Sequence, residues 1–185
     1  MNRNALFRTA KDVALIGIMV AVLIAGQLVL SMIAGVEIVT VLFLSYCVAF
    51  GVRRGMIVGT MFSLMRCLLF GFIPNVVLVY MIYYNGFAVL FGFAGKWLRH
   101  APLLIKIVLL TVFATIVTAC FTLLDDFISP LILGLSARGT RVYFYSSLPV
   151  MIGQMICSAV TVSLLWYPLS KVFALVQPKA PPAQD

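Results

Sequence analysis

Long stretches without a charged side chain constrain this chain more than any other feature. The first runs from Val13 to Val36, and about 20 apolar residues suffice for a helix to cross the roughly 30 Å hydrocarbon core of a bilayer. Of the 185 residues, 64% are hydrophobic and only 10% are charged, whereas water-soluble domains have about 45–50% and about 25%. The sequence therefore excludes a water-soluble globule and a disordered chain, and it predicts a polytopic membrane protein.

The breaks between the apolar stretches predict an all-α fold with six transmembrane helices. These stretches are apolar on all sides, whereas the strands of a membrane barrel alternate apolar and polar residues. The predicted helices cover residues 13–36, 38–52, 56–72, 76–94, 103–124 and 148–169. A tight turn is expected at Arg53-Arg54-Gly55, and a break at Pro74-Asn75. We expect one membrane domain, residues 1–176, followed by a disordered tail, residues 177–185.

Basic residues predict which side each loop faces. The loops on the cytoplasmic side of a membrane protein carry an excess of Lys and Arg. If the N-terminus is cytoplasmic, the residues on that side are Arg3, Arg8, Lys11, Arg53, Arg54, Lys96, Arg99, Lys106, Lys171 and Lys179. Only Arg138 and Arg141 then lie outside. Both termini are therefore expected in the cytoplasm, and the net charge of +8 is attributed to topology and anionic lipid, not to nucleic acid.

The segment from Asp125 to Ser147 is expected to form a long outer loop. It contains Pro130, Gly134 and Gly139, yet it is too apolar for disorder. Long ordered loops in compact proteins are usually functional. The sequence therefore predicts that this segment folds back over the outer face as a lid or an interfacial segment.

Catalytic and metal-binding signatures are missing from the sequence. Gly95-Lys96 resembles the end of a nucleotide-binding P-loop, but Leu90 stands where its first glycine is needed and Trp97 where its Ser or Thr is needed. His100 is the single histidine, which argues against a metal-dependent protease. Asp125 and Asp126 are adjacent and point in different directions on a helix. We expect no enzymatic activity, no metal and no cofactor in this chain.

Arg66 lies inside the third predicted helix, where a charge costs about 2.5 kcal/mol or more on insertion scales. Such a residue faces the bundle or a wet cavity and has a partner. Two interpretations are open and compatible: an ion pair with Glu37, or a contact with a ligand in an outward-facing cavity.

Other polar and aromatic residues fall at a similar depth and suggest one outward pocket. The candidate ligand-binding residues are Glu37, Arg66, Asn75, Tyr80, Tyr83, Tyr84, Asn85, Tyr143, Tyr145 and Gln154. Each has a structural alternative as well. Asn75 could cap the fourth helix, the tyrosines could belong to an interfacial aromatic belt or to bundle packing, and Gln154 could bond to another helix.

Small residues recur along the first predicted helix and form a flat seam. They are Ala10, Ala14, Gly17, Ala21 and Ala25. Small residues at this spacing let another helix approach closely. The partner could be another helix of this chain or a second membrane protein.

Together these features resemble the substrate-binding S components of energy-coupling-factor (ECF) vitamin transporters. Those proteins are six-helix prokaryotic membrane proteins of about this size, with both termini inside. Ala10-x-x-x-Ala14 and Ala21-x-x-x-Ala25 match the small-residue motif with which their first helix docks the coupling subunit. The stretch GVEIVTVLFLSYCVAFGVRRGMIVG is similar to their first loop and second helix.

The resemblance implies a vitamin-binding subunit of the prokaryotic plasma membrane. Its expected partners are a transmembrane coupling subunit and two ATPase subunits, which use ATP, and the lipid bilayer. The segments TLLDDFISPLILGL and YFYSSLPVMIGQMICSAVTVSLLWYPL resemble a subgroup associated with cobalamin, which is placed first. Pantothenate, pyridoxine, folate or a similar vitamin is the alternative.

Three other classes stay open from the sequence alone. One is a secondary transporter or channel half that dimerises, which would need helices broken at mid-membrane. Another is a membrane enzyme built on Asp125, Asp126 and Arg66. The third is an assembly protein that uses only the small-residue seam.

Overall fold

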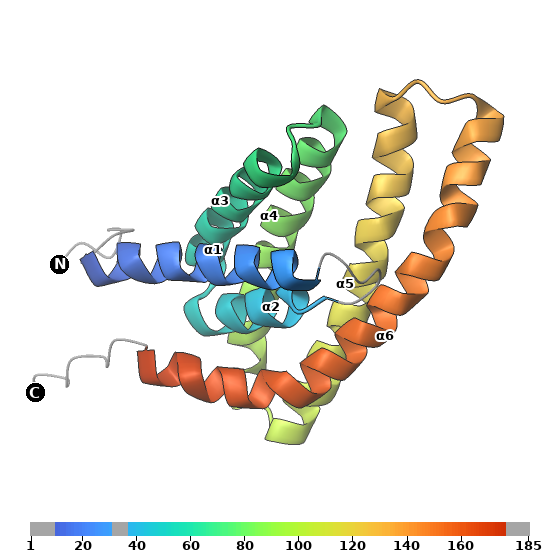
Figure 1. The fold of residues 1–185 in the computed structure, drawn as a ribbon. Helices are drawn as coiled ribbons and strands as arrows, with labels where there is room; N and C mark the ends of the chain where they lie inside the picture. Colours follow the sequence, from blue (N-terminus) through green and yellow to red (C-terminus); the bar gives the residue numbers. More distant parts are fainter. Residues whose placement is uncertain (1–9, 31–36, 177–185) are drawn as a thin grey trace, which may run out of the picture.

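The computed structural model describes residues 10–30 and 37–176, and in these ranges the chain is helical without strands. The helices are α1 Ala10–Leu30, α2 Val39–Phe50, α3 Val52–Phe70, α4 Pro74–Trp97, the 3₁₀ turn η1 Leu98–His100, α5 Leu103–Ile132 and α6 Ala137–Val176 (Figure 1). Four segments are long and apolar enough to cross a membrane: α1, α4 with η1, α5 and α6. The predicted tail, residues 177–185, and the end of the first predicted helix, residues 31–36, lie outside the described residues.

The long outer loop predicted from Asp125 to Ser147 is wrong. Helix α5 continues to Ile132 and α6 begins at Ala137, so only residues 133–136 connect them. Pro130 lies in the last turn of α5, where the missing backbone N–H disrupts little of the helix beyond it. The polar residues in this segment bond between the two helices, as described below, and therefore need no loop.

The tight turn predicted at Arg53-Arg54-Gly55 is also misplaced. The chain turns at Gly51, the residue before α3 begins, which has a φ of +81°. Side chains other than glycine rarely adopt this conformation. Arg54 therefore lies in the first turn of α3, where its guanidinium forms an ion pair of 2.8 Å with Asp12 of α1.

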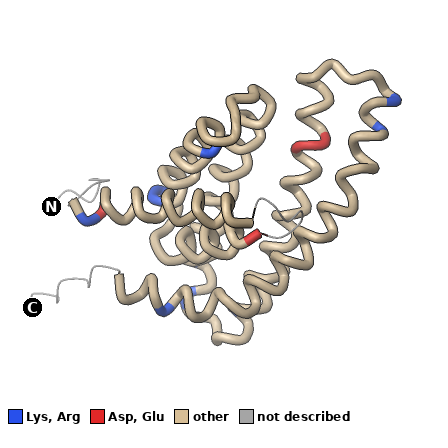
Figure 2. The backbone as a smooth tube through the Cα atoms, viewed as in Figure 1, with Lys and Arg blue, Asp and Glu red and all other residues tan. Residues whose placement is uncertain are grey.

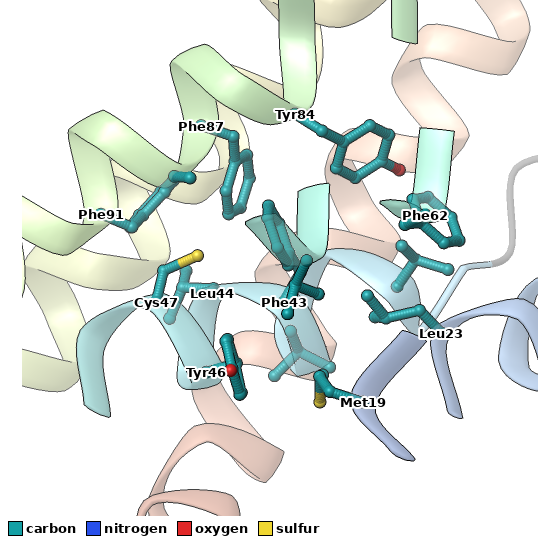
Figure 3. Packing of buried hydrophobic residues seen from close by; sticks show 14 of the residues in the cluster. Met19, Leu23, Phe43, Leu44, Tyr46, Cys47, Phe62, Tyr84, Phe87 and Phe91 are labelled. Atoms are coloured by element: carbon teal, nitrogen blue, oxygen red, sulfur yellow. The ribbon is translucent and has the colours of Figure 1, made fainter. Parts of the chain in front are cut away.

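Helix α2 is the centre of the molecule. It packs against each of the other five α-helices, and eight of its 12 residues are buried. Phe43, Leu44, Tyr46 and Cys47 are fully enclosed. In Figure 3 Phe43 lies among Tyr84 and other aromatic side chains, with Leu23 of α1 nearby; its ring centroid is 5.4 Å from that of Tyr84.

Glycines allow α4 to lie unusually close to α2 and to the start of α3. A Cβ atom placed on Gly92 would be 2.6 Å from the backbone nitrogen of Val52, and one on Gly95 would be 2.6 Å from the carbonyl oxygen of Val48. Small residues at helix contacts are typical of membrane proteins, where backbone approach and van der Waals packing drive association. The second and fourth helices are therefore held together by backbone proximity.

The helix ends divide into two sides. In Figure 1 the first residues of α1 and the last residues of α6 lie at the left of the molecule, the α3–α4 and α5–α6 connections lie at the top, and the α4–α5 turn lies at the bottom. Lys and Arg lie near the start of α1, along α3, in the C-terminal part of α6 and at the start of α6 (Figure 2). In Figure 1 the α3–α4 and α5–α6 hairpins diverge towards their connections.

The outer surface of the helices is strongly apolar. Leu104, Leu68 and Val29 are among many large apolar side chains that are exposed. Exposed apolar patches of this extent are rare on water-soluble monomers, but lipid tails cover such surfaces in a membrane. This surface fits the helices that are long enough to span a bilayer.

Replacement of Gly92 by alanine is expected to lower the stability of the protein. The added Cβ would meet Val52 at distances that require the helices to move, and such overpacking costs about 1–3 kcal/mol. Gly86 on the same helix is the matched control, because a Cβ there has nothing within 4 Å. Thermal unfolding in detergent should show a lower midpoint for Gly92→Ala and an unchanged or higher one for Gly86→Ala; equal midpoints would contradict the close approach.

Candidate functional site

A polar network joins the start of α4, the C-terminal part of α5 and the start of α6. The Asp125 carboxylate accepts hydrogen bonds from the Ser129 hydroxyl at 2.6 Å and from the Tyr143 hydroxyl at 2.7 Å. Asn75 donates its amide N–H to Ser129 Oγ at 2.8 Å. One helix turn thus links three helices through side chains alone. The arrangement helps to explain why Asp125 and Tyr143 lie in helices and not in a loop, since the two side chains are hydrogen-bonded across α5 and α6.

Asp126 makes a second link between α5 and α6. Its Oδ2 accepts a hydrogen bond of 2.6 Å from the Ser147 hydroxyl, while its Oδ1 is buried without a partner among the described residues. A buried acceptor without a partner costs about 1–3 kcal/mol.

A cavity of about 310 Å³ lies beside this network, between the C-terminal part of α5 and the N-terminal part of α6. Its lining residues are Phe121, Thr122, Asp125, Tyr143, Ser146, Ser147, Val150 and Gln154. The wall therefore combines one carboxylate, several hydroxyls and an amide with two apolar side chains. Such a mixture is typical of sites for small polar organic molecules, in which a few polar groups fix the orientation.

A wider depression of about 500 Å³ adjoins the cavity at the α5–α6 connection. Tyr143 and Ser146 line both spaces. Arg138 lines only the depression. The cavity therefore has an opening towards the end of the molecule where α5 meets α6.

Arg66 contacts aromatic rings, and Tyr80 separates it from the cavity wall. Its guanidinium lies 4.2 Å from the centroid of the Tyr80 ring and 5.2 Å from that of Phe70. Tyr80 in turn contacts Phe121 edge-on, with centroids 5.4 Å apart, and Phe121 is part of the cavity wall. A cation above an aromatic face gains about 0.5–2 kcal/mol, which helps to offset the burial of this charge.

The ion pair considered between Arg66 and Glu37 is not formed; among the described residues, the ion pair present is Asp12–Arg54. Glu37 accepts a hydrogen bond of 2.6 Å from the Thr40 hydroxyl instead. Its backbone also docks on Cys157 of α6. Burial raises the pKa of the Glu37 carboxyl above its usual value, and the Thr40 hydrogen bond opposes this rise.

Tyr83 faces the cavity region, whereas Tyr84 belongs to the core. The Tyr83 and Phe121 rings are 4.6 Å apart. Tyr84 is buried against Phe43 and Phe62. The tyrosines of α4 that were predicted to bind a ligand therefore divide between the cavity region and the central packing.

Three other predicted residues lie elsewhere. Asn85 accepts a hydrogen bond from Thr60 of α3 at 3.1 Å and thus ties α4 to α3. Tyr145 is 69% exposed and does not line the cavity. Asn75 does not cap α4, since no side-chain hydrogen bond caps this helix, and it contributes to the network of Asp125 instead. Tyr143 and Gln154 are the predicted residues that line the cavity itself.

Several cavity residues were not among the predicted site residues. They are Phe121, Thr122, Asp125, Ser146, Ser147 and Val150. The Thr122 hydroxyl donates a hydrogen bond of 3.3 Å to Gln154 Oε1 of α6. Thr122, Asp125 and Ser129 are three and four residues apart, which places them on one side of α5. This spacing indicates a polar helix face only if the helix continues past Asp125, where the sequence analysis predicted a loop.

The small-residue seam of α1 faces away from the rest of the chain. Its five residues are exposed, while Ile16, Met19 and Leu23 on the opposite side of the helix are buried. A Cβ added at Gly17 would have nothing within 4 Å. The seam therefore does not serve packing among the described helices.

Comparison with protein-family models, with curated proteins and with solved structures finds no match for this chain.

Ser129 is expected to be important for the stability of the α4–α5–α6 contact. Ser129→Ala leaves the Asn75 amide and one Asp125 oxygen without their partner, which should cost about 0.5–2 kcal/mol because polar contacts inside membranes are individually modest. Ser163→Ala is the control, since this exposed hydroxyl bonds only to the carbonyl of Val160 on its own helix. A melting temperature that falls equally in both variants would show that the network adds nothing.

Proposed function

We propose that this chain is the solute-binding membrane subunit of an importer, of the type represented by the ECF S components. The observation that carries the proposal is the polar cavity of about 310 Å³ between the C-terminal part of α5 and the N-terminal part of α6. It lies in a chain whose other exposed surface is largely apolar. The site has binding groups without an evident catalytic constellation, which favours recognition of a molecule over its conversion.

The groups around the cavity favour a ligand with several hydrogen-bonding functions. Tyr143 and Ser147 are anchored by Asp125 and Asp126, so their positions are set before a ligand arrives. Gln154 uses its carbonyl oxygen on Thr122, which leaves its amide NH₂ group able to donate. A preorganised set of this kind reduces the entropy lost on binding.

The volumes bear on which vitamin is bound. Small-molecule sites span about 300–1,000 Å³, so a small vitamin such as pantothenate or pyridoxine fits the cavity of about 310 Å³ alone. Cobalamin, the first candidate from the sequence, is far larger and would have to occupy both this cavity and the adjoining depression of about 500 Å³. A small vitamin and cobalamin therefore both remain candidate ligands, and a binding measurement distinguishes them.

The proposed topology has six membrane crossings and cytoplasmic termini. The distribution of Lys and Arg along the sequence supports it, because ten of these residues fall on the side predicted to be cytoplasmic and only Arg138 and Arg141 on the other side. Helix α2 has 12 residues and spans only about 18 Å. It crosses within a shell of the other helices, which shields its ends from lipid.

The exposed seam of α1 is the proposed docking surface for the coupling subunit. Ala14 and Gly17 leave the α1 backbone accessible, and helices in membranes associate most closely over such residues. ATP would then be hydrolysed by partner subunits, and this chain would supply the solute.

Tyr143→Phe is expected to weaken ligand binding at least about fivefold, because the variant loses the hydroxyl that Asp125 holds beside the cavity. Tyr145→Phe removes the same atom from an exposed ring outside the cavity and should bind normally. Calorimetry of the purified chain with cobalamin, pantothenate, pyridoxine and folate provides the measurement.

Two outcomes of this titration contradict the proposal. If none of these vitamins binds the unaltered chain, the proposed class is wrong. If a vitamin binds but Tyr143→Phe and Tyr145→Phe weaken it equally, the class stands and the cavity is not its site.

Ala14→Trp should abolish co-purification with a coupling subunit while vitamin binding is retained, since the bulky ring prevents close approach of a second helix. Ala174→Trp on α6 is the matched control, because Ala174 is also an exposed alanine of a helix. Retention of the complex in both variants would refute docking through α1.

A further inference from the structure

We propose that a second cavity, at the end of the molecule opposite the solute cavity, binds the headgroup of an anionic phospholipid. It has a volume of about 300 Å³ and lies where the α4–η1–α5 turn meets the C-terminal part of α6. Its lining residues are Val48, Gly95, Leu98, Arg99, Leu103, Lys106, Leu110, Trp166, Tyr167 and Ser170. This cavity shares no lining residue with the proposed solute cavity, and solute binding does not depend on it.

Two cations in the cavity wall lack a counter-ion. Among the described residues, neither Arg99 nor Lys106 forms an ion pair. The Lys106 ammonium donates one hydrogen bond, of 3.0 Å, to the carbonyl oxygen of Arg99. This bond holds the ammonium at the turn and leaves its other N–H groups and the guanidinium available to an anion. Arginine and lysine together are a common combination for phosphate.

Trp166 gives a second and independent indication of a ligand. The residue is only 5% exposed, it lines the cavity, and its indole Nε1 is buried with no hydrogen-bond partner among the described residues. Buried tryptophan N–H groups usually have an acceptor, and a missing one costs about 1–3 kcal/mol. A headgroup oxygen in the cavity would supply it after a small adjustment of side chains.

The surroundings of the cavity favour a lipid over a free phosphate ion. An apolar groove of about 330 Å³ between α4 and α5 adjoins the cavity at Leu98 and Leu110. Phe93 and Trp97 line this groove, and Trp97 is 83% exposed. Acyl chains would cover this groove while the headgroup reaches the cations. Basic pockets between membrane helices on the cytoplasmic side are typical sites for anionic headgroups.

Arg99 and Lys106 also belong to the basic residues that predict the topology. Binding of a headgroup in the cavity therefore has to be distinguished from a general attraction of basic residues to anionic lipid. Lys171 offers the comparison: it lies one turn beyond Tyr167, with its ammonium 5.4 Å from the centroid of that ring, and it does not line the cavity. If basic residues act only through the surface potential, Lys171 should matter as much as Lys106. If the cavity binds a headgroup, only residues of its wall should matter.

The test uses Trp166 as its own reporter. The chain has two tryptophans, so Trp97→Phe leaves Trp166 as the single indole fluorophore. The full chain with this change is reconstituted into phosphatidylcholine vesicles that contain either brominated phosphatidylglycerol or brominated phosphatidylcholine. We expect half-maximal quenching at an about fivefold to thirtyfold lower fraction of the brominated phosphatidylglycerol, since each cation near an anionic lipid contributes about a fivefold preference.

Substitutions then show which basic residues cause the preference for phosphatidylglycerol. Lys106→Gln should reduce it about fivefold, and Arg99→Gln with Lys106→Gln should remove it, whereas Lys171→Gln should leave it unchanged. Equal quenching by the two brominated lipids in the unsubstituted cavity would overturn the proposal without any variant. An equal effect of Lys171→Gln and Lys106→Gln would overturn it too, because the attraction would then be general.

Inorganic phosphate distinguishes the two possible sources of the anion. Millimolar phosphate should leave the quenching unchanged relative to chloride at the same ionic strength. Displacement of the brominated phosphatidylglycerol by phosphate would mean that the cavity takes a free anion, and the lipid proposal would be wrong.

Discussion

The structure depends on one constraint, which is that a short helix is enclosed by all the others. Helix α2 packs against five helices and presents buried side chains around its circumference. Inside a membrane the hydrophobic effect does not drive helices together, so close packing has to do so. Gly92 and Gly95 meet this requirement by bringing the backbone of α4 against Val52 and Val48. The aromatic rings of Phe43 and Tyr84 fill the space that remains further along the same contact.

This central packing fixes one end of the hairpins and leaves the other end to polar contacts. Away from α2, α5 and α6 are joined by the Asp125–Tyr143 and Asp126–Ser147 hydrogen bonds, and the polar cavity lies beside them. At the opposite end, the turn between α4 and α5 brings Arg99 and Lys106 towards Trp166. The two proposed binding sites therefore lie at the two ends of the α5–α6 pair. The two cavities share no lining residue.

The order of the six α-helices in the described residues was predictable from the sequence, because charge-free stretches end near the Arg53-Arg54 pair and at Pro74. The residue at which the chain turns between α2 and α3, Gly51, was not predicted. Nor was the length of α5 and α6. Asp125, Pro130 and Gly134 are loop signals when they are taken singly, and the partners that make Asp125 compatible with a helix, Ser129 and Tyr143, become visible only when α5 and α6 are placed side by side. The cavity residues also become apparent only when α5 and α6 are placed side by side. Tyr143 and Gln154 were predicted from their residue types, whereas Phe121 and Thr122 line the cavity only because of their position on α5.

The most direct test of the central claim asks whether the polar cavity is open to the outside. Ser146 lines the cavity and is exposed, and Ser170 lines the cavity at the opposite end. The account predicts that a membrane-impermeant maleimide labels Ser146→Cys in intact cells, that a bound vitamin protects it, and that Ser170→Cys is labelled only after the membrane is opened. The unaltered chain, whose four cysteines are free, gives the background. Labelling of Ser146→Cys only after the membrane is opened would contradict the account.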